Sequence, residues 1–169
     1  MAQSSKPALR PFLPADTPML AAIFVAAIQE LTGDDYGEAQ QEAWAGVAED
    51  EVAFGNKLAG ELTLIATLQN SPVGFAAMKD NNTIDMLYVH PSAAGQGVGA
   101  MLCDALERLA SARGTQTLSV DASDNALDFF RKRGYVASQR NSVSLDGEWL
   151  ANTTMKKALG TGTAAGASS

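Results

Sequence analysis

The sequence is poor in the residue types on which several protein classes depend. Its 169 residues include one cysteine, Cys103, and one histidine, His90, so no internal disulfide can form and we expect no metal site. Without a partner histidine, Cys103 is expected to be a small packing residue rather than a nucleophile. The sequence shows no signal-peptide pattern and no long apolar run, so we expect no membrane partner and a location in the reducing cytoplasm.

Basic residues are also scarce. The sequence has 12 Lys and Arg and 19 Asp and Glu, a net charge of −7. This balance argues against a nucleic-acid partner, since contacts to phosphates need a basic face. An acidic protein suits a cationic substrate such as an amine, although acidity also serves solubility. With 46% hydrophobic residues, the chain is long enough for one ordinary domain. We place this domain at residues 8–159, between a flexible start (1–7) and a low-complexity tail (160–169).

The most informative stretch runs from Thr83 to Arg113. Apolar residues at strand spacing end at His90-Pro91, and three glycines then lead into a helical pattern. One continuous helical face carries Val98, Met101, Leu102, Ala105, Leu106 and Leu109. A glycine-rich helix start lets the backbone approach a ligand closely, and its free N–H groups attract phosphate. The stretch therefore predicts a strand, a turn that binds pyrophosphate, and a helix.

Two interpretations of this turn compete. The segment Gly95 to Ala100 fits the dinucleotide pattern G-x-G-x-x-(G/A), and Asp121 follows about 20 residues later, where a ribose-binding acid is expected. In that pattern the first glycine ends the strand, whereas residues His90 to Ala94 intervene here. The sequence after the helix also does not repeat strand and helix as a doubly wound sheet does. A dinucleotide-binding redox module therefore stays a less favoured alternative.

The second interpretation accounts for the intervening residues. Leu87-Tyr88-Val89-His90-Pro91, followed by Gly95-Gln96-Gly97-Val98-Gly99, is similar to the phrase L-Y-V-x-P-x-x-(R)-G-x-G-(I/V)-G. This phrase is typical of the GNAT superfamily of acetyl-coenzyme A dependent N-acetyltransferases, which the chain resembles. A second segment, Ser123 to Tyr135, resembles the family pattern S/N-x-x-A-x-x-(F/L)-Y-x-x-x-G-(F/Y). Two positions depart from the family: Ala94 replaces the usual Arg or Gln, and Phe130 replaces a tyrosine that often serves as general acid.

The resemblance implies acetyl-coenzyme A as cofactor and assigns residues to it. The implied contacts are the exposed backbone of a splayed central strand, the glycine turn, and the second motif: Leu87, Tyr88, Val89, Gly95, Gln96, Gly97, Val98, Gly99, Ala100, Ser123, Asn125, Phe129, Phe130 and Arg133. Helix capping is an equally simple role for Ser123 and Asn125.

The resemblance also implies an acceptor side. It places Glu30, Asp34, Asp35, Tyr36 and Trp44 near the amine, although a capping loop with Trp44 in the core would explain them too. Asp85 is the acid nearest to the position from which some members take the amine proton. By strand alternation, Thr83, Asp85, Leu87 and Val89 share one face. With Phe130 unable to donate a proton, Tyr88 or Tyr36 could protonate the departing thiolate, or solvent could.

The rest of the chain indicates the architecture. Residues 8–13 form an edge strand, since Pro11 is tolerated only there, and Thr17 caps a helix whose first residue is Pro18. Strands at 62–68 and 73–79 form an antiparallel meander with the central strand, a strand at 117–121 follows the glycine helix, and a hairpin turns at Asp146-Gly147. We therefore predict an α/β (α+β) GNAT fold: a mixed, mostly antiparallel sheet with a splayed parallel pair and helices on both faces.

The function expected from the resemblance is N-acetyltransfer. Acetyl-coenzyme A would donate its acetyl group to a primary amine, on a small molecule or a peptide, by direct attack in a ternary complex. A non-catalytic acyl-coenzyme A sensor is the alternative, because Ala94 and Phe130 are both losses from the family pattern. We expect a monomer or a homodimer.

Overall fold

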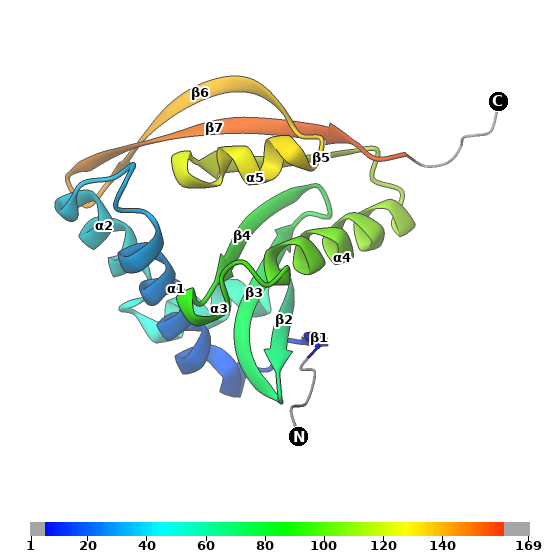
Figure 1. The fold of residues 1–169 in the computed structure, drawn as a ribbon, viewed down its shortest axis with the longest axis horizontal. Coiled ribbons are helices and arrows are strands. Elements are labelled where there is room, and N and C mark those ends of the chain that lie inside the picture. The colour runs from blue at the N-terminus through cyan, green and yellow to red at the C-terminus, as the bar shows by residue number, and fades with distance from the viewer. Residues whose placement is uncertain (1–5, 161–169) are drawn as a thin grey trace.

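The computed structural model describes residues 6–160, and a single seven-stranded sheet organises this part of the chain (Figure 1). The strand order is β1-β2-β3-β4-β5-β7-β6. The strands are β1 (Ala8–Pro11), β2 (Leu62–Leu68), β3 (Ser71–Lys79), β4 (Thr83–Val89), β5 (Thr117–Ser123), β6 (Val136–Leu145) and β7 (Glu148–Ala158). Within residues 6–160, β4 and β5 form the one parallel pair. The predicted mixed, mostly antiparallel α/β fold is confirmed.

Helices cover both faces of the sheet. The helices are α1 (Thr17–Leu31), α2 (Glu38–Ala45), α3 (Glu51–Ala59), α4 (Val98–Ala112) and α5 (Leu127–Lys132). α4 and α5 pack on one face, where Leu102, Leu106 and Phe130 lie in one buried cluster. α1 and α3 pack on the other, where Phe24 and Phe54 lie in a second cluster. No helix in residues 6–160 is both long and apolar enough to span a membrane.

The turns of the meander and of the last hairpin follow the sequence. Gln69 and Asn70 between β2 and β3 have φ of 51° and 69°, and Asp146 and Gly147 between β6 and β7 have φ of 47° and 81°. Asn, Asp and Gly adopt this left-handed conformation at the lowest energy, and two such residues in a row match the twist of a hairpin. The predicted hairpins are confirmed. The predicted flexible start and tail fall mostly on residues 1–5 and 161–169, which lie outside the described residues.

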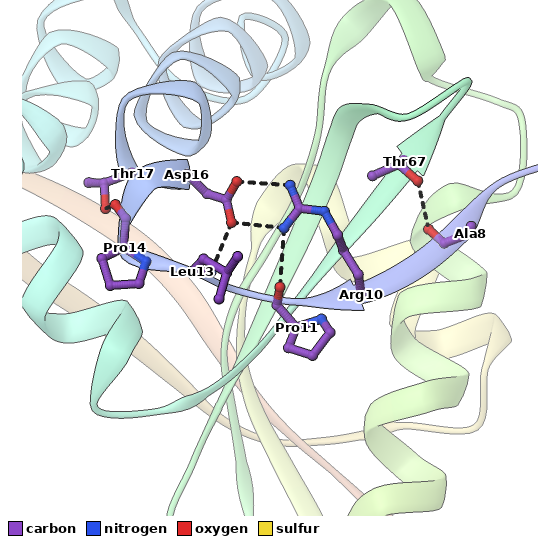
Figure 2. Close-up of polar contacts among 8 residues, drawn as sticks. All are labelled: Ala8, Arg10, Pro11, Leu13, Pro14, Asp16, Thr17 and Thr67. Carbon is purple, nitrogen blue, oxygen red and sulfur yellow. Dashed lines mark hydrogen bonds and ion pairs between the residues drawn. The ribbon is translucent and has the colours of Figure 1, made fainter.

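The start of α1 differs from the prediction (Figure 2). The carboxylate of Asp16 receives two hydrogen bonds of 2.8 Å from the Arg10 guanidinium of β1 and a third of 2.8 Å from the Leu13 N–H. These bonds lower the pKa of Asp16 and join the edge strand to the helix. Thr17 is already the first helical residue, and its hydroxyl donates backwards to the Pro14 carbonyl at 2.8 Å. The predicted Thr17 cap is therefore wrong, because a short 3₁₀ turn precedes the helix.

A β-bulge at Asp85 overturns the predicted alternation along β4. Ala77 of β3 pairs with Met86, and the next residue, Met78, pairs with Ile84, so Asp85 has no partner on β3. A bulge inserts one residue into a strand and thereby exchanges its faces. Leu87 and Val89 pack on the α4 side, whereas Met86 packs on the α1 side and Asp85 reaches Lys57 of α3. Asp85 therefore does not share a face with Leu87 and Val89.

Candidate functional site

A wedge between β4 and β5 opens into a cavity. The two strands pair only at Thr83 with Ser119 and at Ile84 with Val120, and beyond these residues they separate. The cavity measures about 340 Å³ and is walled by α1, the α1–α2 loop, α2, β4, β5, α5 and the β6–β7 hairpin. In Figure 1 this hairpin runs above α5. A splayed pair leaves the facing backbone of both strands without a neighbour, so it can bind an extended ligand.

The start of α4 lies next to this wedge and offers free backbone donors. Gly95 and Gly97 have φ of 79° and 82°, a conformation that favours glycine. The first hydrogen bond of α4 runs from the Met101 N–H to the Gly97 carbonyl oxygen at 3.0 Å. In residues 6–160 the N–H groups of residues 95–100 donate to no protein acceptor. These six donors, together with the positive end of the helix dipole, suit an anion such as pyrophosphate.

Contacts around Gly99 connect this turn with α5. A Cβ on Gly99 would lie 3.4 Å from Phe129 Cε1 and 3.8 Å from Val89 Cγ2, so glycine allows α4, α5 and β4 to meet. Arg133, at the end of α5, stacks 5.7 Å above the Phe129 ring and pairs with Asp104 of α4. Phe130, the residue in the usual tyrosine position, is 3% exposed and packs edge-on against Tyr135. Phe130 is also one of the residues that line the cavity.

Tyr88 and Trp44 form an aromatic wall of the cavity. The indole Nε1 of Trp44 donates to the Tyr88 hydroxyl at 3.2 Å, and the Tyr88 ring packs edge-on against Phe24. Burial raises the pKa of Tyr88 well above its ordinary value, so the hydroxyl stays protonated near neutral pH. Because the oxygen already accepts from Trp44, its own proton remains to be donated, and no acceptor for it lies within residues 6–160. The Tyr88 hydroxyl thus has a proton without an acceptor in the described chain, at the wall of the cavity.

Tyr36 also lines the cavity, but its hydroxyl is engaged. It donates to the Ala151 carbonyl of β7 at 2.6 Å and accepts from the Asp124 N–H at 2.9 Å. Burial raises its pKa. The residue is 5% exposed and joins the α1–α2 loop to two distant segments. These contacts favour a structural role for Tyr36 over proton transfer.

Asp85 is the carboxylate at the point where the strands separate. Its Oδ2 lies 2.9 Å from Nζ of Lys57, which also lies 3.4 Å from Oε2 of Glu61. Glu61, directly before β2, is an acid that the sequence did not single out. Burial, then the neighbouring Asp85 carboxylate, raises the pKa of Glu61. The wedge therefore has a carboxylate at its apex and a second one behind it.

Most of the residues expected at the site from the sequence lie around the wedge. Those that line the cavity are Tyr36, Trp44, Asp85, Leu87, Tyr88, Val89, Ser123, Asn125 and Phe130. Those beside it are the turn residues Gly95, Gln96, Gly97, Val98, Gly99 and Ala100, with Phe129 and Arg133. Glu30 is exposed and, like Asp34 and Asp35, does not line the cavity. Ser123 makes no side-chain capping bond. The sequence missed Lys57, Glu61 and the apolar lining from Leu31, Val143, Leu145 and Leu150, because only tertiary contacts place them here.

Comparisons with known proteins agree with this geometry. A family model described as "Acetyltransferase (GNAT) domain" matches residues 32–159. The uncharacterized N-acetyltransferase YafP of Escherichia coli is 32% identical over 148 residues, covering 88% of this chain and 93% of that protein. A GCN5-related N-acetyltransferase structure from Rhodopseudomonas palustris is 64% identical, with a TM-score of 0.90, and covers 94% of this chain and 99% of that one. PaiA N-acetyltransferase from Thermoplasma acidophilum, solved with coenzyme A, shares the fold at 16% identity and a TM-score of 0.75, covering 90% and 99% of the two chains.

Proposed function

Because the chain belongs to the GNAT acetyltransferase family, we propose that it transfers the acetyl group of acetyl-coenzyme A to a primary amine by direct attack in a ternary complex. The observation that carries this proposal is the continuity between the glycine turn of α4 and the wedge between β4 and β5. The groove has donors for an anion at one end and a cavity with a carboxylate at the other. This arrangement matches a long ligand with a phosphate group at one end and a reactive thioester at the other. Acetyl-coenzyme A is that cosubstrate and supplies an electrophilic carbonyl and a thiolate leaving group.

Backbone groups without a protein partner indicate which residues would hold the cosubstrate. The N–H groups of residues 95–100 would bind the pyrophosphate, since they have no protein acceptor in residues 6–160. The backbone of Leu87, Tyr88 and Val89 would pair with the amides of the pantetheine arm, because β5 has separated from β4 there. Ser123, Asn125 and Phe130 would contact the arm from the opposite wall. Phe129 and Arg133 lie nearer the turn, where Arg133 can approach a phosphate. Ala94 offers no side-chain donor, so the turn would act through its backbone.

The remaining chemistry concerns two protons. Asp85 would take the proton of the incoming ammonium, directly or through water, so that the amine can attack the thioester carbonyl. Tyr88 would donate a hydrogen bond to the leaving sulfur, because its proton is free and its raised pKa keeps it protonated. The hydroxyl of Tyr36 is already engaged with Ala151, so we assign it to the support of Trp44 and the loop.

Replacing Tyr88 with phenylalanine tests the second proton. The variant keeps the ring between Phe24 and Trp44 and removes only the hydroxyl. We expect kcat to fall about tenfold while KM for acetyl-coenzyme A is unchanged, because a lost hydrogen-bond donor weakens the transition state. Steady-state thiol release measures both constants. An unchanged kcat would show that solvent protonates the thiolate. A Tyr36→Phe variant is the matched comparison and is expected to lose stability rather than kcat.

The walls of the acceptor side indicate the class of amine. Leu31, Val143, Leu145 and Leu150 line the cavity together with Trp44, and no Lys or Arg side chain is among the lining residues of the described chain. An acceptor with an apolar body would bury its surface there, whereas a carboxylate would lose water without finding a cation. We therefore propose apolar primary amines as acceptors in preference to free amino acids.

A matched pair of acceptors tests both the activity and this preference. Phenethylamine and phenylalanine differ by one carboxylate, and thiol release with each gives kcat/KM. We expect phenethylamine to be favoured at least about tenfold, which corresponds to about 1.4 kcal/mol. Equal constants would contradict the apolar acceptor class. The protein could instead bind acetyl-coenzyme A but release no thiol with these amines or with a wider panel. That result would support the alternative of an acyl-coenzyme A sensor, which phenylalanine at position 130 in place of the usual tyrosine also suggests.

A further inference from the structure

Behind the cavity, a single ammonium group serves two carboxylates. Lys57 Nζ of α3 lies 2.9 Å from Asp85 Oδ2 and 3.4 Å from Glu61 Oε2. The Glu61 side chain is 9% exposed, and its second oxygen, Oε1, is buried without a hydrogen-bond donor in the described chain. Asp85 Oδ2 is buried as well and, although Lys57 is close, it accepts no well-directed hydrogen bond. The cluster has a net charge of −1 and buried oxygens that lack donors.

One added proton would remove both the net negative charge and the lack of a donor. It would neutralise the cluster, and it would give a buried carboxylate oxygen the donor that it lacks. Two adjacent carboxylates hold a first proton more tightly than either holds one alone, because like charges disfavour double ionisation. The direction of the pKa agrees: burial and Asp85 raise the pKa of Glu61, while Lys57 opposes this. Lys57 from α3 and Tyr88 on β4 are the other ionisable groups that act on the pair, and Tyr88 stays protonated.

We propose that Asp85 and Glu61 act as one proton acceptor, in which Glu61 is a positioning residue that shares the proton taken up by Asp85. The catalytic half of this inference rests on the proposed acetyl transfer. Asp85 touches the incoming ammonium group and takes its proton before the nitrogen attacks. The proton is then shared between Asp85 and Glu61, and it leaves to solvent after the amide product dissociates. The ionised pair is the active form, so kcat/KM rises with pH through the pKa of the pair.

Carboxyl NMR tests the shared proton in the protein without substrate. In protein labelled with ¹³C at the side-chain carboxyls, we expect Glu61 to titrate above the ordinary range of about 4, and the Asp85 signal to respond in the same pH range because the two carboxyls share the proton. In Glu61→Gln this titration should disappear, also from the Asp85 signal. In Lys57→Met the pair should titrate at higher pH than in the wild type, because the opposing cation is gone. Independent titrations of both residues at ordinary values would overturn the proposal.

The pH profile of thiol release tests the role of Glu61 in catalysis. In Glu61→Gln the acid limb of kcat/KM should move to lower pH and the plateau should fall about tenfold, since a weaker base drives proton transfer less. The affinity for acetyl-coenzyme A should not change. Glu51→Gln, an exposed residue at the start of α3, is the control and should match the wild type. If Glu61 were only structural, Glu61→Gln would leave the acid limb in place. That result would overturn the proposed role of Glu61 in catalysis. If no amine is acetylated, the proposed acetyl transfer is wrong. The NMR titration still shows whether Asp85 and Glu61 share a proton.

Discussion

Binding of acetyl-coenzyme A is expected to weaken at least about a hundredfold in Gly97→Trp, equal to about 2.7 kcal/mol. Gly97 is the N-cap of α4 with φ of 82°, and no heavy atom lies within 4 Å of a Cβ built on it. A side chain there would project into the open space in front of the free N–H groups, where the pyrophosphate would bind. It would also strain the backbone by about 1–2 kcal/mol, because left-handed φ is unfavourable for residues with a Cβ. Calorimetric titration with acetyl-coenzyme A gives the dissociation constant.

Gly114→Trp is the matched control for this variant. Gly114 follows the other end of α4, has φ of 89°, and likewise has no heavy atom within 4 Å of its Cβ position. The two variants therefore carry the same backbone strain and the same added side chain, but only Gly97 lies at the proposed anion site. Equal affinities in both would contradict the assignment of the turn. Titration with NADH should show no binding, since the mostly antiparallel sheet of residues 6–160 does not match the doubly wound sheet of a dinucleotide site.

Thiol release is expected to fall by about 10² or more in Asp85→Asn, the usual contribution of a general base. The amide has nearly the same shape as the carboxylate but cannot accept the amine proton. The loss should appear in kcat, and the affinity for acetyl-coenzyme A should be kept, because Asp85 lies at the apex of the wedge and away from the glycine turn. Raising the pH should partly restore the rate, since more of the amine is then unprotonated in solution.

Two variants separate this effect from the loss of charge. Asp80→Asn changes the same charge in the turn before β4, where φ of 54° suits asparagine, and it should leave turnover unchanged. Lys57→Met removes the ion pair but keeps the Asp85 carboxylate, so activity should survive at high pH with its acid limb moved upward. If Lys57→Met lost as much activity as Asp85→Asn, the ion pair rather than the base would be the feature that matters.

Local sequence signals predicted the parts of the molecule that depend on neighbours in the chain. The turn at Asp146-Gly147 needs left-handed backbone at two successive residues, and the residue types alone indicate it. The glycine turn and the apolar face of α4 are equally local. α3 was missed because Gly55 interrupts its helical pattern. A Cβ at Gly55 would lie 2.8 Å from Thr17 Oγ1, so close packing against α1 requires the glycine that a sequence pattern treats as a break.

The sequence by itself determined the order of the strands, the glycine turn before α4 and the family, since turn chemistry, periodicity and motif spacing all act over short stretches of chain. The tertiary structure alone decided which side chains meet at the wedge. The bulge at Asp85 exchanges the faces of β4, and this brings the carboxylate to Lys57 and Glu61 instead of to the side of Leu87. The Tyr36 hydroxyl finds its acceptor on Ala151, 115 residues away. Strand register and long-range contacts depend on how the whole core packs, and no local pattern encodes them.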